Sequence, residues 1–169
     1  MAKNDSATTT VEVGKPEIVI AREFDAPRAL VWRAWTEPKE FMRWWGPKDF
    51  TAPVAKIDFR VGGTYLFCMR SPDGQDYYST GVYREIVPLQ RIVYTDSFAD
   101  ENGKVVSAAH YGMGEDFPLE LLVTLTFEDY EDGKTRFTLR HAGMPEGEDS
   151  EMTQMGWNQS LDKLAETLQ

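Results

Sequence analysis

The chain has 169 residues, a length that fits one domain with a single hydrophobic core. Its 18 basic and 28 acidic residues give a formal net charge of −10, which repels nucleic acid and anionic lipid. No apolar run approaches the roughly 18 residues of a membrane span, so we expect neither nucleic-acid binding nor membrane insertion. The single cysteine, Cys68, excludes an internal disulfide, and no secretory signal is visible. The sequence therefore predicts a cytoplasmic protein.

The chain is predicted to form one domain over residues 17–169, preceded by a disordered lead-in over residues 1–16. The lead-in is polar and turn-prone, as in "NDSATTT". The domain begins with "EIVIAREF", where apolar and polar residues alternate except at Arg22. This period of two predicts a half-buried strand over residues 17–24.

Two short helices are predicted after the first strand. In "DAPRALVWRAW" the apolar residues recur at helical spacing, and Asp25 is placed to cap the helix. The segment "TEPKEFMRWWGP" repeats this pattern and ends at the Gly46–Pro47 stop. The adjacent residues Trp44 and Trp45 therefore fall in the last turn of the second helix.

The directions of these tryptophans follow from helical geometry. Residues four apart in a helix point within ~40° of each other, and residues three apart differ by ~60°. Phe41 and Trp45 therefore share a direction from which Trp44 diverges. We predict that Trp44 plugs the core and that Trp45 borders a ligand.

The middle of the chain is a run of alternating segments joined by turns such as "SPDGQ" and "YEDGK". Strands are predicted over residues 54–63, 64–70, 76–87, 90–98, 119–129 and 134–143. Sequential hairpins of this kind make an antiparallel sheet. Residues 99–118 are too long for an ordinary hairpin, so they form an excursion over the edge of the sheet or a lid.

An amphipathic helix is predicted over residues 151–169, capped by Asp149 or Ser150. Its apolar stripe consists of Trp157, Leu161, Leu164 and Leu168, extended by Met152 and Met155. Lys163 lies off this stripe, so we expect its replacement by alanine to change stability very little. The helix can bury its stripe only against the sheet, which predicts an α+β layered fold.

Sequence motifs for catalysis, metal binding or cofactor binding are not found. The chain has no HExxH, paired CxxC, GxSxG, GxGxxG or GxxxxGK pattern. Cys68 lies in the middle of a predicted strand, where a buried and inert thiol is typical. We therefore assign no catalytic residue, no metal and no cofactor.

A few ionisable residues are nevertheless candidates for acid–base work. Asp96 and Glu85 share the parity of apolar neighbours on their strands, and a carboxyl group facing an apolar interior gains a raised pKa that suits proton transfer. Solvated strand ends are the alternative for both. His110 lies in the long excursion, whereas His141 has the inward parity of its strand and is predicted to be a hydrogen-bonded structural residue.

Aromatic and methionine residues are unusually plentiful for one small domain. They are predicted either to form the core alone or to enclose a ligand cavity as well, and the pattern leaves both alternatives open. If a cavity exists, its ligand-binding residues are predicted to be Phe41, Trp45, Phe67, Met69, Tyr83, Tyr94, Phe98, His110, Tyr111, Met113, Met155 and Trp157.

Four segments together resemble a known family. They are "FDAPRALVWRAWTEPKEFMRWWGP", "GGTYLFCMRSPDGQDYYSTGVYREIVPLQRIVYTDSF", "FPLELLVTLTF" and "GWNQSLDKLAETL". In order and spacing they are similar to short bacterial proteins of the activator of heat shock protein 90 ATPase homologue-like (AHSA) family. That family belongs to the START-like, polyketide-cyclase-like (SRPBCC, Bet v-like) superfamily. The resemblance spans residues 17–168.

The resemblance implies a helix-grip fold. In this fold a curved antiparallel sheet of six or seven strands wraps around a long C-terminal helix, with two short helices between the first and second strands and a cavity between helix and sheet. The superfamily includes lipid carriers, hormone receptors, cyclases and chaperone regulators, so the resemblance implies the fold rather than one activity.

Three functions follow as hypotheses. The leading one is a non-enzymatic domain that binds a small hydrophobic or amphipathic molecule in the cavity. The second is an enzyme of cyclase, dehydratase or hydrolase type that uses His110, Glu85 or Asp96 as acid or base. The third is a chaperone-associated, stress-response regulator with an exposed apolar patch. We also expect association as a homodimer, because open sheet edges and exposed aromatic residues favour it.

Overall fold

The structure is a computed structural model that describes residues 16–114 and 117–169. Its strands are β1 (Glu17–Phe24), β2 (Thr51–Ile57), β3 (Thr64–Arg70), β4 (Asp76–Val87), β5 (Arg91–Ala99), β6 (Leu121–Tyr130) and β7 (Lys134–Ala142). Its helices are α2 (Arg28–Thr36), α3 (Pro38–Phe41), the 3-10 helix η1 (Ala108–Tyr111) and α4 (Glu148–Thr167). The predicted lead-in, apart from Pro16, lies outside the described residues.

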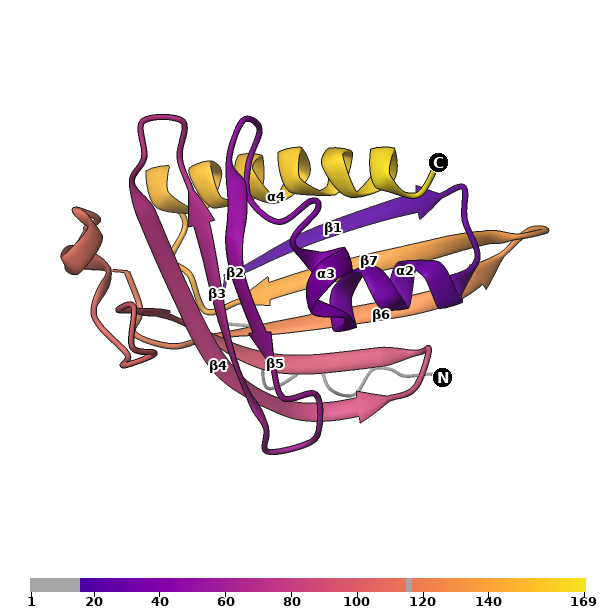
Figure 1. Ribbon diagram of the computed structural model, residues 1–169, viewed down its shortest axis with the longest axis horizontal. Helices are drawn as coiled ribbons and strands as arrows, with labels where there is room; N and C mark the ends of the chain where they lie inside the picture. Colours follow the sequence, from indigo (N-terminus) through magenta and orange to yellow (C-terminus); the bar gives the residue numbers. More distant parts are fainter. Residues whose placement is uncertain (1–15, 115–116) are drawn as a thin grey trace.

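Within the described part of the chain, seven strands form one antiparallel sheet in the order β1-β7-β6-β5-β4-β3-β2. The first two strands of the chain therefore lie at opposite edges. Helix α4 runs beside β1, while α2 and α3 cover the sheet further along (Figure 1). This is the α+β helix-grip fold that the sequence predicts.

The strand predictions are confirmed, with one clear error in the bounds. The strand predicted over residues 54–63 instead covers Thr51–Ile57. The backbone N–H of Arg60 donates to the carbonyl of Asp58 over 2.9 Å, and Gly62 has φ of 86°. These residues therefore form the turn into β3, since a positive φ suits glycine in a turn and not a residue inside a strand.

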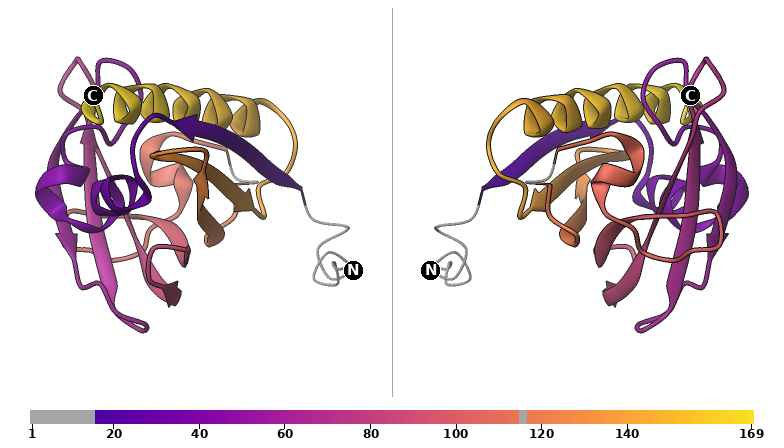
Figure 2. Two further views of the ribbon diagram at one scale, coloured as in Figure 1. Left: turned by 90° about the vertical axis from the view of Figure 1, so that its right-hand side faces the viewer. Right: turned by 90° about the vertical axis from the view of Figure 1, so that its left-hand side faces the viewer.

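A bulge between β4 and β5 bends the sheet. The pairing register shifts between Tyr83 and Glu85, and the N–H of Val82 donates to the Thr95 side-chain hydroxyl over 2.8 Å. The Thr95 carbonyl approaches Gly81 so closely that any Cβ there would collide with it. Bulges increase local twist, and the resulting curved sheet wraps one face toward α4 (Figure 2).

The two short helices are present, but their ends differ from those predicted. Pro27 occupies the N-cap position of α2 and no side chain makes a capping hydrogen bond there, so the predicted Asp25 cap is wrong. Helix α3 ends at Phe41, and the following N–H groups bond three or four residues back, as Trp44 and Trp45 both do to the Phe41 carbonyl over 3.3 and 3.1 Å. Trp44 therefore lies in the turns beyond α3, and the segment ends as predicted at Gly46, whose φ is 105°.

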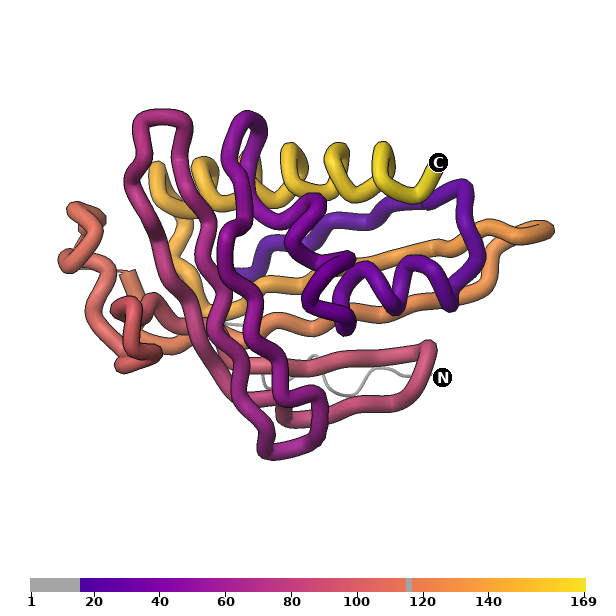
Figure 3. The backbone as a smooth tube through the Cα atoms, in the orientation of Figure 1, coloured from indigo at the N-terminus to yellow at the C-terminus, as the bar shows by residue number. Residues whose placement is uncertain are grey.

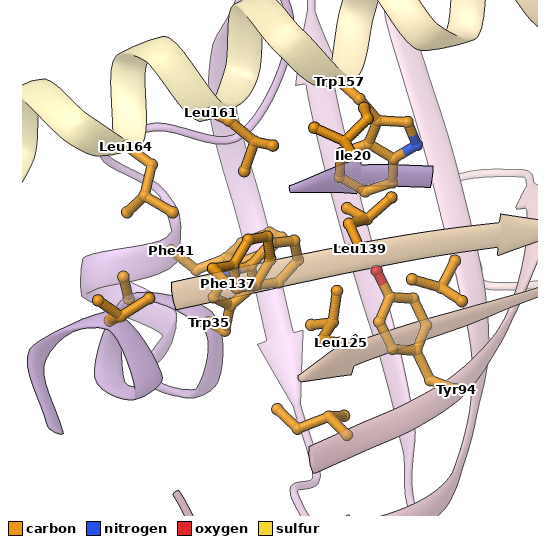
Figure 4. Packing of buried hydrophobic residues seen from close by; sticks show 14 of the residues in the cluster. Ile20, Trp35, Phe41, Tyr94, Leu125, Phe137, Leu139, Trp157, Leu161 and Leu164 are labelled. Atoms are coloured by element: carbon orange, nitrogen blue, oxygen red, sulfur yellow. The ribbon is translucent and has the colours of Figure 1, made fainter. Parts of the chain in front are cut away.

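Helix α4 buries the predicted central part of its stripe. Trp157, Leu161 and Leu164 are buried and point toward the sheet (Figure 4). The extension to Met152 and Met155 is wrong, because these side chains are 57% and 59% exposed. Met155 precedes Trp157 by two residues, a helical rotation of about 200°, so it faces away from the sheet.

The start of α4 also differs from the prediction. The helix begins at Glu148, and Gly147 occupies the N-cap position without a side-chain capping bond. Asp149 and Ser150, the predicted caps, therefore lie inside the first turn. Acidic side chains in the first turn stabilise the partial positive charge of a helix N-terminus, so Asp149 favours this start without capping it.

Arg22 explains the break in the alternation of β1. Its guanidinium pairs with Asp162 over 3.0 Å and donates to the Asn158 carbonyl over 3.0 Å. The arginine therefore has the same orientation as the apolar residues of β1 and reaches α4. It links the edge of the sheet to the helix.

The contacts of Lys163 disagree with the expectation that this residue contributes little to stability. Its Nζ donates to the carbonyls of Gly46, Pro47 and Phe50 over 2.9–3.2 Å. Burial lowers the pKa of this amine, and Asp49 and Glu166 oppose that shift. Lys163 thus holds the segment after α3, residues 42–50, against the C-terminal helix. Helical periodicity alone does not reveal this contact.

The core is centred on Trp35, between the short helices and the sheet. Its ring lies 4.7 Å from Trp44 in an edge-on arrangement and stacks at 5.6 Å on Phe137. Cys68 is also fully buried, as predicted, and burial raises the pKa of its thiol. Aromatic packing therefore fills the middle of the molecule.

The excursion between β5 and β6 is attached to the end of the sheet (Figure 3). Val105 forms a bridge with Ala99, and the Val106 N–H donates to the Phe98 carbonyl over 2.9 Å. The Tyr111 hydroxyl donates to the Ala99 carbonyl and accepts a bond from the Tyr78 N–H over 3.2 Å. The described part of the excursion is thus held beside the ends of β4 and β5.

Candidate functional site

A cavity of about 430 Å³ lies between the N-terminal half of α4 and the ends of β3, β4 and β5. The segment after α3 and the excursion complete its wall. Its lining residues belong to the end of the molecule where α4 begins, and Figure 1 shows the excursion projecting at that end. Its volume falls within the roughly 300 to 1,000 Å³ of typical ligand pockets.

Aromatic and methionine side chains dominate the wall of this cavity. The aromatic residues that line it are Trp45, Phe50, Tyr77, Tyr78, Phe98, Tyr111, Phe117 and Trp157, and the methionines are Met69, Met113, Met144 and Met152. Phe98 contacts Tyr111 and Phe117, with ring centroids 5.4 and 5.3 Å apart. The excursion and the sheet therefore form one continuous apolar wall.

The adjacent tryptophans have different environments. Trp44 is 0% exposed and donates its indole N–H to the Ala34 carbonyl over 2.9 Å. Trp45 is half-buried, lines the cavity, and stacks on Phe41 at 4.7 Å. Trp44 is thus a core plug and Trp45 has the direction of Phe41, as the helical geometry predicts. Contact between Trp45 and a ligand stays a prediction.

Polar groups gather at one part of the cavity wall. Asp96 of β5 and His141 of β7 both line the cavity, and the Asp96 Oδ2 lies 3.4 Å from the His141 Nε2. The Tyr65 hydroxyl donates to the Thr95 carbonyl at 2.8 Å and lies 3.3 Å from the Asp96 Oδ1. Burial, followed by the Asp96 charge, raises the pKa of Tyr65. Tyr65 therefore stays a neutral donor beside the carboxylate.

The protonation of His141 follows from its hydrogen bonds. The indole N–H of Trp157 donates to its Nδ1 over 2.9 Å, so Nδ1 carries no proton and the neutral ring carries its proton on Nε2. That N–H has no hydrogen-bond partner among the described residues, because its approach to Asp96 lacks hydrogen-bond geometry. The His141–Asp96 contact is therefore not a salt bridge.

The structure brings only some of the predicted ligand-binding residues to the cavity. Those that line it are Trp45, Met69, Phe98, Tyr111, Met113 and Trp157. The others lie elsewhere: Phe41, Phe67, Tyr83 and Tyr94 are buried in the core, while His110 and Met155 are exposed. Strand parity identifies inward-facing residues but does not separate the core from a cavity on the same face.

Several cavity residues were not predicted as ligand contacts. Phe50 and Phe117 lie in the segment after α3 and in the excursion, where no periodic pattern marks them. Tyr77 lies in β4 with the parity of Tyr83, and that parity is the signal that could have found it. The inward parity of Asp96 and His141 was the available signal for the polar groups. His141 is 3% exposed and hydrogen-bonded, as predicted, and a purely structural role stays a prediction because the residue also lines the cavity.

The three candidates for acid–base work lie in different parts of the structure. Glu85 is exposed and pairs with Arg91 over 3.0 Å, and His110 is exposed beside Tyr111. Asp96 alone among these candidates lines the cavity, with its side chain 25% exposed. Any proton transfer inside the cavity would therefore rely on Asp96.

Residues 16–114 and 117–169 contain no group of three or more histidine, cysteine or acidic side chains arranged to hold a metal ion. None of their helices is long and apolar enough to span a membrane.

Comparison with known proteins identifies the family. The family model described as Activator of Hsp90 ATPase homolog 1-like protein matches residues 25–169. A crystal structure of a protein from Chromobacterium violaceum is 30% identical and has a TM-score of 0.74, covering 90% of this chain and 96% of that one. A solution structure from Arthrobacter aurescens is 26% identical with a TM-score of 0.73, covering 90% and 85% of the two chains.

A third solved structure agrees in fold alone. The AHSA1 protein of Silicibacter pomeroyi is 23% identical, with a TM-score of 0.68 over 90% of this chain and 97% of that one. No curated protein matches the chain. The family match and the helix-grip architecture support the resemblance found in the sequence, and this chain belongs to the Activator of Hsp90 ATPase homolog 1-like family.

Proposed function

We propose that this protein binds a small, largely apolar molecule in the cavity below the N-terminal half of α4. The observation that carries the proposal is a space of about 430 Å³ walled mainly by aromatic and methionine side chains. Burial of apolar ligand surface supplies roughly 25 cal/mol per Å² before the costs of association. Methionine adapts to different ligand shapes, so the wall suits a small hydrophobic or amphipathic molecule.

Trp45, Trp157 and Met69 are the proposed principal contacts. They come from the segment after α3, from α4 and from β3, so they enclose the ligand from three directions. Phe98, Tyr111 and Met113, which also line the cavity, extend this contact surface toward the excursion. Family membership supports a helix-grip cavity but does not choose its ligand.

The test uses a neutral probe and a variant that fills the cavity. Phenylbutanol is expected to raise the thermal unfolding midpoint of the protein in a saturable manner, because a ligand that binds only the folded state stabilises it. Gly156 lines the cavity from inside α4, and a Cβ there meets only ordinary contact with Pro47. Gly156→Leu is therefore expected to occupy the space and to abolish the shift.

This variant separates lost binding from damage to the fold. Replacing a mid-helix glycine by leucine improves helix propensity by roughly 0.8 kcal/mol, so Gly156→Leu is expected to be at least as stable as the parent protein. A probe that stabilises both proteins equally would contradict binding in this cavity. The absence of any saturable effect on the parent protein would count against the proposed function itself.

An enzymatic function is the second hypothesis, and its support is narrower. Both nitrogens of His141 are unsuitable as a base, because Nδ1 accepts from Trp157 and Nε2 carries the proton. Asp96 alone would have to act as acid or base. The chaperone-associated role, the homodimer and the cytoplasmic location remain predictions from sequence and family resemblance.

A further inference from the structure

We infer that the ligand of this cavity is an organic cation, an amphipathic amine whose ammonium group pairs with Asp96. This inference rests on the proposed binding function and specifies its ligand class. The observation that carries it is a carboxylate inside an apolar, aromatic cavity that has no cationic partner among residues 16–114 and 117–169. A buried or half-buried charge is normally paired, so a ligand cation is a natural complement.

The protein leaves most of the hydrogen-bonding capacity of Asp96 unused. A carboxylate can accept about four hydrogen bonds, yet within the described part of the chain Asp96 has one long bond, 3.3 Å from the Tyr65 hydroxyl. The better bond of that hydroxyl goes to the Thr95 carbonyl at 2.8 Å. His141 lies 3.4 Å away without hydrogen-bond geometry. Strong acceptor positions on Asp96 therefore remain for a ligand.

The cavity also lacks a positive charge of its own. No lysine or arginine occurs among its lining residues, all of which belong to the described part of the chain. The Nδ1 of His141 accepts the indole N–H of Trp157, and an imidazole nitrogen that accepts a hydrogen bond carries no proton. The nearby Arg70 is paired with Asp76 at 2.6 Å, and Lys163 is bonded to backbone carbonyls on another part of α4. The charge of Asp96 is thus uncompensated within the cavity.

The aromatic wall suits an ammonium ion as well as an apolar tail. Aromatic faces, tryptophan above all, attract cations that lie within about 6 Å of the ring. Trp45 and Trp157 both line the cavity, and their ring centroids lie 5.3 Å apart in an edge-on arrangement. Asp96 lines the same space. A cation held by Asp96 can therefore gain from aromatic faces while its carbon chain packs against methionine.

Side chains beside the cavity carry negative charge, as Asp96 does. The first turn of α4 carries Glu148, Asp149 and Glu151, directly before the cavity residues Met152 and Thr153. Acidic groups beside a cleft raise the local concentration of cations and repel anions. The site therefore disfavours fatty-acid-like carboxylates and favours amines.

The experiment compares three probes with one carbon skeleton: phenylbutylamine, phenylbutanol and phenylbutyrate. Their affinities for the full chain are measured by isothermal titration calorimetry at neutral pH, where the amine is a cation and the acid an anion. We expect phenylbutylamine to bind about tenfold more tightly than phenylbutanol, because a charge-assisted bond replaces a neutral one. Phenylbutyrate is expected to bind most weakly.

Two variants then assign the preference to one carboxylate. Asp96→Asn keeps the shape and the acceptor for Tyr65 but removes the charge, so it is expected to reduce the amine-over-alcohol preference to near unity. Asp132→Asn changes the net charge equally at an exposed turn between β6 and β7, remote from the cavity, and is expected to retain the preference. Circular dichroism checks that both variants are folded.

The other possible outcomes would each contradict a different part of the proposal. Equal or tighter binding of phenylbutanol or phenylbutyrate by the parent protein would overturn the cation inference and leave the cavity function standing. This comparison needs no variant, so misfolding of Asp96→Asn would not protect the inference. A preference that survives Asp96→Asn would overturn the role of Asp96. Failure of all three probes to bind would contradict the cavity function and the inference together.

Discussion

The indole N–H of Trp157 donates to the Nδ1 of His141 over 2.9 Å, joining helix α4 to strand β7 beside the cavity. Both side chains are buried, so the bond is made where water does not compete. It leaves the Nδ1 of His141 as an acceptor and directs the Nε2 of the ring to the region of Asp96. One bond therefore contributes both to the fold and to the polarity of the candidate site.

Removal of this hydrogen bond is expected to destabilise the protein. Trp157→Phe leaves Nδ1 of His141 buried without a donor, an effect of roughly 1–3 kcal/mol beyond the lost packing. Trp35→Phe is the matched control, because it also shortens a buried indole whose N–H has no partner among the described residues. Urea unfolding is expected to show the larger loss for Trp157→Phe; a larger loss for Trp35→Phe would contradict the assigned role.

The buried tyrosines are expected to make the protein sensitive to alkali. Burial raises the pKa of Tyr65, Tyr83 and Tyr94 above the ordinary value of 10.0. Above that pH the unfolded chain loses phenol protons that the folded protein retains. The stabilisation by the neutral phenols is therefore complete below pH 10.0 and declines as pH rises further.

Tyr94→Phe separates this titration from packing. The Tyr94 hydroxyl is buried and has no partner among the described residues, so its removal is expected to be neutral or slightly stabilising at pH 7. Above pH 10, the decline in unfolding free energy is expected to lessen by up to about 1.4 kcal/mol per pH unit. Tyr65→Phe is the contrast, because it also loses the bond to the Thr95 carbonyl. An unchanged alkaline slope in Tyr94→Phe would refute this account.

Replacement of Lys163 is expected to affect stability despite its position off the apolar stripe. Lys163→Ala removes three hydrogen bonds to carbonyls of the segment after α3 and is expected to lower the unfolding free energy by roughly 1–3 kcal/mol. Lys48→Ala, an exposed lysine in that same segment, is expected to change it little. Equal unfolding midpoints for the two variants would show that the contacts of Lys163 carry no net stability.

The adjacent tryptophans are expected to separate binding from folding. Trp45→Ala should weaken phenylbutylamine binding more than it lowers stability, because the ring lines the cavity. Trp44→Ala should mainly destabilise, by roughly 3–5 kcal/mol, because the ring is fully buried. Calorimetric affinity and urea midpoint are measured for both variants. A Trp45→Ala protein that loses stability without a selective loss of affinity would contradict the cavity role.

The strands and helices could be predicted from local patterns, whereas the set of residues that lines the cavity could not. Alternation and turn residues identified the strands, and helical spacing identified the buried face at Leu161. Tyr94 and Phe98 have the same parity on β5, yet Tyr94 lies in the core and Phe98 lines the cavity. Their difference depends on what packs across the sheet, which parity does not encode. The contacts of Lys163 with Gly46 are likewise tertiary.

The most direct test of the central claim uses the methionine methyl groups as reporters in a heteronuclear NMR titration with phenylbutanol. Met69, Met113, Met144 and Met152 line the cavity, whereas Met42 and Met155 lie outside its lining. We predict saturable chemical-shift changes for the first four methyl groups and very small changes for the other two, with one shared dissociation constant. Larger changes at Met42 and Met155 than at the cavity methionines, or no saturable change at any of them, would contradict ligand binding in this cavity.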